Sequence, residues 1–293
     1  MLPLTLQDPM SVQTSARPLS LNYQAIAEDF AELAVAAGAA VMLFYNADSH
    51  AREKGDTSPV CDADLAGEAV ILAGLAARLP ELPVVSEEAA SAGAKSVGGD
   101  AFILVDPVDG TREFLAGKGE FTVNIGLIVH GEPKVGAVYA PALEQMWLAG
   151  DHAVTFPVSP GAKLPPLAER ARIEARRPEH DGLVALTSWS HTDPRTSAFL
   201  ETLPVKERRM IGSSLKFCAL ADGSADIYPR FGATMEWDTA AGDAILRAAG
   251  GIVLDRDGQP LRYGKTATKF MNGSFVAWAD PDAIPDVLGA RRA

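Results

Sequence analysis

The chain has 293 residues, enough for one large α/β unit or two closely packed lobes. A hydrophobic fraction of 47% and a charged fraction of 22% are typical of a globular protein, and a net charge of −12 argues against nucleic-acid binding through a general positive field. Two distant cysteines, Cys61 and Cys218, exclude a disulfide scaffold and suit a reducing compartment.

Residues 1–22 are rich in Pro, Ser, Thr and Gln without periodicity, so we expect a flexible N-terminal arm. The arm lacks the basic start and the long apolar run of a signal peptide. No segment approaches the ~18–20 continuous apolar residues of a transmembrane helix. These features predict a cytoplasmic protein with no transmembrane segment, and they leave open a peripheral location at the inner membrane.

Residues 23–155 are predicted to form an α+β lobe. Apolar residues recur at helical spacing from Tyr23 to Tyr45, and a second helix is expected from about Leu65 to Leu79. Short strands are predicted at 82–86 (LPVVS) and 101–105 (AFILV), the first followed by a loop. Residues 121–150 then show the turns and alternation of an antiparallel meander.

Residues 156–293 are predicted to form an α/β lobe, which an irregular connection over about 151–181 joins to the first. Strands and helices alternate after this connection. The predicted strands are 183–188, 207–211, 225–231, 251–255 and 274–279, and the predicted helices are 194–202, 214–223 and 237–250.

Acidic side chains stand at the ends of several predicted elements rather than on solvated faces. They are Glu87 and Glu88 after LPVVS, Asp106 and Asp109 after AFILV, and Asp238 at the start of the last long helix. Carboxylates with few His or Cys residues nearby form an all-oxygen ligand set, which favours Mg²⁺, Mn²⁺ or Ca²⁺ over zinc. Pro107 limits the backbone between two of these residues. We therefore expect Asp106, Asp109 and the carbonyl of Val108 to face a common point.

The same residues have simpler interpretations. DPVDG (106–110) is a good turn sequence, a Glu-Glu pair usually lies on the surface, and an Asp at a helix start is usually an N-cap. If Thr111 begins a helical turn, however, the N–H groups of Gly110 and Thr111 would form an anion site beside the carboxylates. A metal site next to an anion site is typical of a metal-assisted phosphatase, in which the ions neutralise phosphate and activate water.

Several segments, in order, resemble the inositol-monophosphatase superfamily of Mg²⁺-dependent, lithium-sensitive phosphatases. They are SPVCDAD (58–64), Glu87-Glu88, DPVDGT (106–111) and WDTAAGD (237–243). The longer segments DPVDGTREF, GEFTVNIGLI, GAVYAP, GSSLKFCALADGSADIYPRFG and EWDTAAGDAIL most resemble the CysQ-type 3′(2′),5′-bisphosphate nucleotidases. The similarity covers nearly the whole chain after about residue 23. It implies a layered αβαβα sandwich with the site between the lobes.

The resemblance implies two or three Mg²⁺ ions, with Mn²⁺ able to substitute. Glu87, Asp106 and the carbonyl of Val108 would hold the first ion. Asp106, Asp109 and Asp238 would hold the second, and a third, weaker ion would lie near Glu87.

The resemblance also implies the catalytic residues Asp64, Thr111 and Glu87. Asp64 and Thr111 would form the pair that activates the attacking water, and the N–H groups of Gly110 and Thr111 would bind the scissile phosphate. The residues expected to border the substrate in the first half of the chain are Glu87, Val108, Asp109, Gly110 and Thr111.

In the second half, the expected substrate residues are Ser190, His191, Ser213, Lys216, Arg230 and Asp238. Lys216 and Arg230 would bind a second phosphate, and Ser213, with Ser214, would donate hydrogen bonds. The pair Ser190 and His191 resembles the family's Ser-His pair that approaches the nucleotide. The alternative is that the Lys and Ser are ordinary surface and helix-capping residues and that the His is structural.

One position departs from the family pattern, since Cys61 stands where the family usually has Thr. Asp64 keeps its place relative to Ser58, Pro59 and Val60, so we expect the catalytic pair to be retained and Cys61 to be a neutral packing change. A reactive cysteine is the alternative, although no His or basic residue is adjacent to it in sequence.

The function implied is hydrolysis of the 3′-phosphate of adenosine 3′,5′-bisphosphate, with 3′-phosphoadenylyl sulfate as a related substrate, which belongs to sulfur metabolism. An inositol-phosphate or sugar-phosphate phosphatase would share the metal chemistry, and GSSLKF and YPRF argue against it. A non-catalytic metal- or nucleotide-binding regulator would need neither Asp64 nor Thr111. The expected partner is a small-molecule nucleotide bisphosphate rather than nucleic acid, and a homodimer is left open.

Overall fold

The computed structural model describes residues 21–45, 52–53, 59–60, 62–91, 99–179, 181–189 and 193–284. The predicted arm up to residue 20, Cys61, Ser190 and His191 lie outside these ranges.

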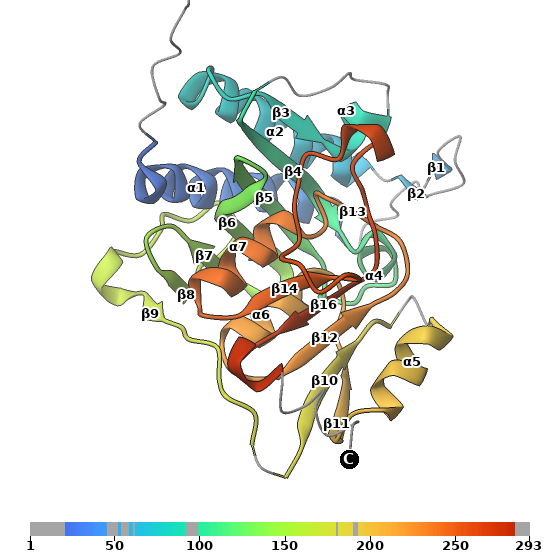
Figure 1. The fold of residues 1–293 in the computed structure, drawn as a ribbon. Coiled ribbons are helices and arrows are strands. Elements are labelled where there is room, and N and C mark those ends of the chain that lie inside the picture. The colour runs from blue at the N-terminus through green and yellow to red at the C-terminus, as the bar shows by residue number, and fades with distance from the viewer. Residues whose placement is uncertain are drawn as a thin grey trace, which may run out of the picture.

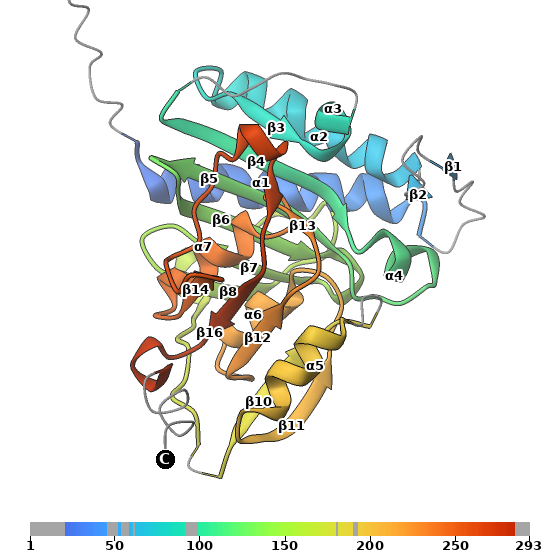
Figure 2. The ribbon, with the colours of Figure 1, turned by 45° about the vertical axis from the view of Figure 1, so that its right-hand side comes forward.

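Helices and sheets alternate in five layers (Figure 1). Helices α1 (Tyr23–Met42) and α2 (Asp62–Arg78) cover the outer face of a seven-stranded sheet. Helices α6 (Leu215–Ala221) and α7 (Ala240–Ala248) lie between this sheet and a five-stranded one, and α5 (Pro194–Glu201) covers the far side of the second sheet. The turned view shows the same stacking (Figure 2). This is the layered αβαβα sandwich expected from the sequence.

The seven-stranded sheet has the order β3-β4-β5-β6-β7-β8-β9. Only its β3–β4 pair is parallel, and the other pairs are antiparallel. Its strands are β3 (Val84–Ser86), β4 (Ala101–Asp109), β5 (Thr122–Val129), β6 (Glu132–Ala140), β7 (Gln145–Ala149), β8 (Ala153–Pro157) and β9 (Ala171–Arg172). β4, β5 and β6 are almost continuously buried because helices pack on both of their faces.

The five-stranded sheet has the order β11-β10-β12-β16-β14. β10 pairs in parallel with β11 and β12, whereas β16 is antiparallel to both of its neighbours. The strands are β10 (Leu183–Thr187), β11 (Val205–Met210), β12 (Ile227–Arg230), β14 (Ile252–Asp255) and β16 (Phe275–Trp278). The short elements are β1 (Arg52–Glu53), β2 (Pro59–Val60), α3 (Glu87–Ser91), α4 (Thr111–Leu115), β13 (Thr234–Met235), β15 (Met271–Asn272) and the 3₁₀ turns η1 (Pro141–Leu143), η2 (Leu167–Glu169), η3 (Thr266–Thr268) and η4 (Pro281–Ala283).

Three local predictions were wrong. The Gly/Ser-rich loop predicted over 89–99 begins later, because residues up to Ser91 belong to helix α3. The connection predicted to be irregular contains strands β8 and β9, which lengthen the first sheet. Strands β13 and β15 were not predicted, because two-residue strands carry no periodicity. The lobe boundary at residues 155 and 156 stays a prediction.

Two glycines let α7 approach the first sheet closely. Gly126 on β5 and Gly136 on β6 are paired in register. A side chain at Gly126 would lie 2.9 Å from the Cβ of Ala240, and one at Gly136 would overlap the carbonyl oxygen of Ala241. The start of α7 therefore packs directly on the backbone of the sheet. This contact fixes the distance between the sheet and the residues just before the helix.

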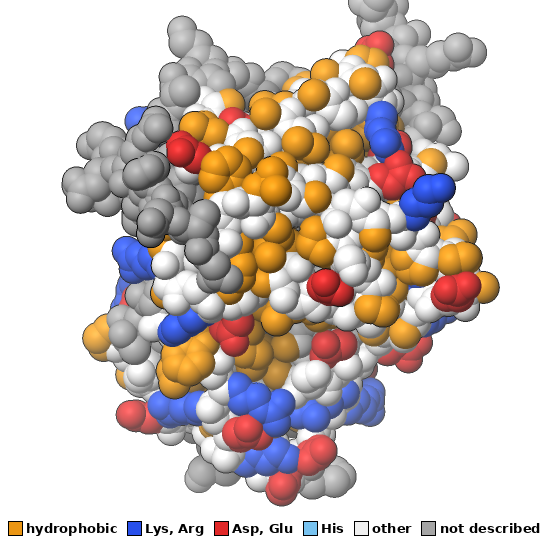
Figure 3. Space-filling model, turned by 180° about the vertical axis from the view of Figure 1, so that it is seen from behind, with side chains coloured by type: hydrophobic (Ala, Val, Ile, Leu, Met, Phe, Trp, Pro, Cys, Tyr) orange, Lys and Arg blue, Asp and Glu red, His pale blue; other side chains and the backbone are white. Residues whose placement is uncertain are grey.

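Basic side chains gather in a band across the lower part of the molecule seen from behind (Figure 3). Several cations in the second half of the chain are paired with acidic groups: Arg176 with Asp226, Arg177 with Asp280 and Asp282, Lys206 with Glu179 and Asp181, and Arg209 with Glu207. Within the described ranges, none of the helices combines the length and the apolar character that crossing a membrane requires.

Candidate active site

Three aspartates converge at the end of β4 and the turn before α7. Asp106, Asp109 and Asp238 each offer one carboxylate oxygen, and these three oxygens lie within 4.8 Å of one another. Asp106 is buried, and the other two side chains are partly exposed. The sequence predicted that these three residues would meet, and the structure brings them together.

An irregularity in β4 allows two aspartates of one strand to face the same point. Residues three apart on a regular strand point to opposite faces. Here the register with β5 shifts between Asp106 and Asp109, and the Val108 N–H donates to Asp106 Oδ1 at 3.0 Å. Pro107 lies within the shifted stretch, where its missing N–H interrupts no ladder bond. The predicted turn is thus an irregular strand end, which directs both carboxylates to one side.

The cluster carries strong mutual repulsion. Burial raises the pKa of Asp106 well above its usual value, and the charges of Glu87, Asp109, Asp238 and Asp64 raise it further. Burial and the charge of Asp109 likewise raise the pKa of Asp238. Carboxylates this close need a cation to remain charged together, and an all-oxygen set of this kind fits a hard divalent ion such as Mg²⁺.

Hydrogen bonds from the second half of the chain orient Asp109. Its Oδ2 accepts from the Ser213 hydroxyl at 2.6 Å and from the Ser214 N–H at 2.7 Å. The Ser214 hydroxyl donates to the carbonyl of Asp238 at 2.8 Å and accepts from Asn124 Nδ2 at 3.0 Å. One polar network therefore ties two of the clustered aspartates to each other and to β5.

Sequence reasoning missed two members of this network, Thr122 and Asn124. Both are buried on β5, where the Thr122 hydroxyl donates to Asn124 Oδ1 at 2.8 Å and lies 2.6 Å from the Ser213 hydroxyl. Polar side chains within the apolar run FTVNIGLIV (121–129) were the signal, because a buried polar group needs a partner.

Asp238 is not a helix cap. Its Oδ2 accepts from the Met235 N–H at 2.8 Å, upstream of the helix. α7 begins at Ala240, and its N-cap residue Thr239 makes no side-chain cap bond. The N-cap interpretation of Asp238 was therefore wrong, and its carboxylate faces the cluster.

A cavity of about 260 Å³ opens over the carboxylates. Its lining includes eight of the predicted site residues, namely Glu87, Asp109, Gly110, Thr111, Ser213, Lys216, Arg230 and Asp238. It also includes Tyr228, Thr234 and Thr239, which sequence reasoning did not select. The remaining predicted residues within the described ranges, Asp64, Asp106 and Val108, are buried.

The turn from Gly110 to Thr111 lies at one edge of this cavity. Gly110 has φ 91°, a left-handed conformation that favours glycine, and α4 begins at Thr111. The Thr111 hydroxyl donates to the carbonyl of Val108 at 3.2 Å. Asp64 lies in the first turn of α2, and its charge contributes to the raised pKa of Asp106, which places it near the cluster. The Asp64–Thr111 pair stays a prediction.

The predicted cations Lys216 and Arg230 line the same cavity as the carboxylates, and so does Arg112. Lys216 is buried, and its Nζ donates to the carbonyls of Ile211 at 3.1 Å and Ser213 at 2.6 Å. Burial lowers the pKa of Lys216 to about 8. Arg230 donates from Nη2 to the carbonyl of Ala233 at 3.2 Å, and its buried Nε has no hydrogen-bond partner among the described residues.

A second cavity of about 730 Å³ adjoins the first. The two share Ser188, Tyr228, Arg230 and Ala233. The larger cavity extends along α5 and β11, where Pro194, Met210 and Pro229 supply apolar surface. A ligand with charged and less polar parts could therefore span both cavities, with Arg230 at their boundary.

Known proteins resemble this chain over most of its length. The model of the "Inositol monophosphatase family" matches residues 22–282. The chain is 42% identical over 251 residues to the 3′(2′),5′-bisphosphate nucleotidase CysQ of Salmonella typhimurium, covering 85% of this chain and 97% of that protein. The crystal structure of CysQ from Bacteroides thetaiotaomicron is similar with a TM-score of 0.75 and 34% identity, over 87% of this chain and 97% of that one. An inositol monophosphatase from Anabaena matches with a TM-score of 0.70 and 25% identity, over 92% and 97% of the two chains.

Proposed function

The chain belongs to the inositol monophosphatase family, and we propose that it is a Mg²⁺-dependent phosphatase that converts adenosine 3′,5′-bisphosphate to AMP and phosphate. 3′-Phosphoadenylyl sulfate would be a second substrate and would give adenylyl sulfate. Mn²⁺ would substitute for Mg²⁺, and lithium would inhibit. The relatives named as 3′(2′),5′-bisphosphate nucleotidases support this choice.

One observation carries the proposal: Lys216 and Arg230 line the same cavity as the carboxylates. A substrate with a single phosphate would need only the carboxylate end, where the ions bind. Lys216 and Arg230 give the opposite charge to a second phosphate, and within the described ranges the buried Nε of Arg230 has no hydrogen-bond partner, so it can donate to that phosphate. The adjoining cavity of about 730 Å³ offers space for the nucleoside.

At the carboxylate end, Glu87, Asp106 and the Val108 carbonyl would hold one ion, and Asp106, Asp109 and Asp238 a second. A third, weaker ion would lie near Glu87. When bound, Mg²⁺ neutralises phosphate charge and lowers the pKa of water.

The remaining roles fall to residues of the turn and of α2. The N–H groups of Gly110 and Thr111 would hold the scissile phosphate. The Thr111 hydroxyl would donate to Asp64 instead of to Val108, and together the two would draw a proton from the attacking water. Ser213 would border the substrate while its hydroxyl proton stays on Asp109, and Ser190 and His191 would approach the nucleotide.

Initial rates on a panel of substrates test the proposal. Adenosine 3′,5′-bisphosphate should be hydrolysed with the highest kcat/KM, and AMP, which lacks the 3′-phosphate, should be left intact. A higher kcat/KM for inositol 1-phosphate or fructose 1,6-bisphosphate would reject the nucleotidase assignment in favour of the corresponding phosphatase. Tight binding of the bisphosphate without turnover in Mg²⁺ would instead indicate a regulator.

A further inference from the structure

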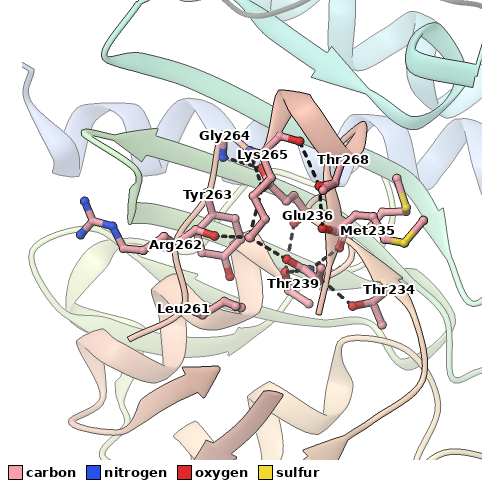
Figure 4. Close-up of polar contacts among 12 residues, drawn as sticks. Thr234, Met235, Glu236, Thr239, Leu261, Arg262, Tyr263, Gly264, Lys265 and Thr268 are labelled. Carbon is pink, nitrogen blue, oxygen red and sulfur yellow. Dashed lines mark hydrogen bonds and ion pairs between the residues drawn. The ribbon is translucent and has the colours of Figure 1, made fainter. Parts of the chain in front are cut away.

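An ion pair with a fully buried carboxylate lies directly beside the segment that carries Asp238. Glu236 is fully buried, and its carboxylate accepts three hydrogen bonds: from the Gly264 N–H at 2.7 Å, the Lys265 N–H at 2.9 Å and Lys265 Nζ at 3.2 Å. Figure 4 shows Glu236 and Lys265 directed toward each other, with Thr239 and Met235 close by. Neither Glu236 nor Lys265 lines the cavity over the carboxylates, so neither is placed to touch the substrate.

Asn272 connects this pair to both sides of Asp238. Its Oδ1 accepts from Lys265 Nζ at 3.1 Å. Its Nδ2 donates to the Met235 carbonyl at 2.9 Å and to the Thr239 hydroxyl at 3.0 Å. Met235 and Thr239 stand on either side of Asp238. Two hydrogen bonds join Met235 to Asp238: the Asp238 N–H donates to the Met235 carbonyl at 3.2 Å, and the Met235 N–H donates to the Asp238 carboxylate at 2.8 Å.

The backbone of the neighbouring segment is held in an unfavourable conformation. Lys269 and Phe270, neither of them glycine, have φ of 53° and 62°. The Phe270 carbonyl accepts from the Glu236 N–H at 2.8 Å. Two consecutive left-handed residues persist only where the surrounding contacts determine them, and such strain is typical of functional sites. The contacts here are those of Glu236 and Lys265.

Asp238 needs such support because it faces the charges of Asp109 and Glu87 across the cluster. Without a cation, repulsion favours any movement of its turn away from β4. The Met235 N–H opposes this movement only if Met235 is itself held. Pairing of β13 with β15 and the Asn272 bond hold it.

We propose that Glu236, Lys265 and Asn272 are positioning residues that hold the Asp238 carboxylate at the distance required for ion binding. The inference rests on the metal site of the proposed function. It assigns part of the ion affinity to a lysine that touches neither ion nor substrate. The role is mechanical, since an electrostatic effect of Lys265 would have the opposite sign: a cation near the site weakens binding of another cation.

Mn²⁺ binding to the metal-free full-length chain, followed by electron paramagnetic resonance of free Mn²⁺, tests this directly. In Lys265→Met the dissociation constant of the ion at Asp238 should rise about tenfold, the low end of the range seen when support of a metal ligand is lost. The matched control is Arg176→Met. Arg176 pairs with the fully buried Asp226 with a side-chain exposure of 28%, against 29% for Lys265 with Glu236, but Asp226 is bonded to Val184 on β10 and not to the turn of Asp238. Arg176→Met should bind Mn²⁺ as the wild type does.

Asn272→Asp is a second variant that keeps the bond from Lys265 and loses the two donors toward Met235 and Thr239. If only the electrostatic field at the ion mattered, the added negative charge should tighten Mn²⁺ binding. Weaker Mn²⁺ binding therefore supports the positioning role. This test remains available even if Lys265→Met does not fold. Mn²⁺ affinity equal to or above that of the wild type, in folded Lys265→Met or in Asn272→Asp, would overturn the positioning role and leave the proposed function standing. Failure of the wild type to bind Mn²⁺ would overturn both the inference and the proposed metal mechanism.

Discussion

The Ser213 hydroxyl donates a 2.6 Å hydrogen bond to the Asp109 carboxylate, although 104 residues separate the two in the chain. Ser213 adopts φ 52° at this point, a left-handed conformation that is costly for a residue with a side chain. The bond links the end of β4 in the first sheet to the turn before α6. Orientation of a first-half carboxylate thus depends on a strained residue of the second half.

Ser213→Gly and Ser213→Ala separate the hydroxyl from the backbone strain. Both variants should weaken Mn²⁺ binding by about 10–100-fold, because Asp109 loses a hydrogen bond that orients it. Only alanine retains the strained Cβ, so Ser213→Gly should be more stable than Ser213→Ala by about 1 kcal/mol. Titration with Mn²⁺ and urea unfolding measure the two effects, and unchanged Mn²⁺ affinity in both variants would contradict the role of Ser213.

Asp238→Asn should lower the activity and raise the stability of the metal-free protein. The pKa of Asp238 is raised in the folded protein, so its stabilising contribution is present below its unfolded pKa and is lost as pH rises through the folded pKa. In EDTA at neutral pH the variant should therefore have a higher Tm than the wild type, and the difference should narrow on acidification. Activity in Mg²⁺ should fall more than about 100-fold. A lower Tm of the variant in EDTA would show that Asp238 is not destabilised by its neighbours.

Thr111→Val removes the hydroxyl and keeps the shape of the side chain, and Thr111→Ser restores the hydroxyl. Loss of proton transfer should lower kcat of the valine variant about 10²–10⁴-fold with Mn²⁺ affinity unchanged. The serine variant should recover most of the rate. If valine and serine were equally slow, the contribution of Thr111 would lie in packing, and circular dichroism would establish whether the fold had changed.

Lys216 should limit kcat/KM at high pH. Its pKa is lowered to about 8, so above that pH the free enzyme loses the charge that would bind the second phosphate. kcat/KM reports groups of the free enzyme, and a basic limb near pH 8 is expected for adenosine 3′,5′-bisphosphate but not for Lys216→Met. A loss of folding stability caused by deprotonation of Lys216 cannot explain this basic limb of the pH profile. Between its folded pKa and the unfolded value near 10.5 the unfolded chain binds more protons, so this group adds stability as pH rises.

Gly136→Ala should displace the start of α7, because the new methyl group would overlap the carbonyl of Ala241. Overpacking of this kind lowers the free energy of unfolding by about 1–3 kcal/mol. Since Asp238 lies two residues before α7, Mn²⁺ affinity should fall as well. Gly273→Ala is the control, since nothing lies within 4 Å of a Cβ built at Gly273. Equal stability of the two variants would contradict the close approach of helix and sheet.

Local sequence signals predicted the parts of the site that lie at strand ends. An apolar run that stops at Asp106 and Asp109 identifies a buried strand and its end, and Glu87 and Asp238 were selected because they also stand at the ends of predicted elements. The anion site proposed for the turn required a helix that begins at Thr111, and α4 begins there, after Gly110 in a left-handed conformation. The layered architecture also followed from the resemblance.

Long-range partners could not be predicted in this way. Glu236 precedes a recognised motif, but its partners Gly264 and Lys265 lie 28 and 29 residues later in a segment without periodicity. Lys216 was expected near a phosphate, yet its two backbone acceptors depend on the turn at Ser213. Burial of Asn124 among apolar neighbours was visible in the sequence, whereas the identity of its partner required the fold.

The dependence of Asp109 on Ser213 also bears on how the protein is made. Chains fold from the N-terminus during synthesis at about 5–20 residues per second, so the 104 residues between them take roughly 5–20 s to appear. During this interval the strand that carries Asp106 and Asp109 is already translated, and the half that closes the site is not. The ribosome-bound intermediate would present an acidic, open edge without turnover, and catalysis would begin only when translation of the second half is complete.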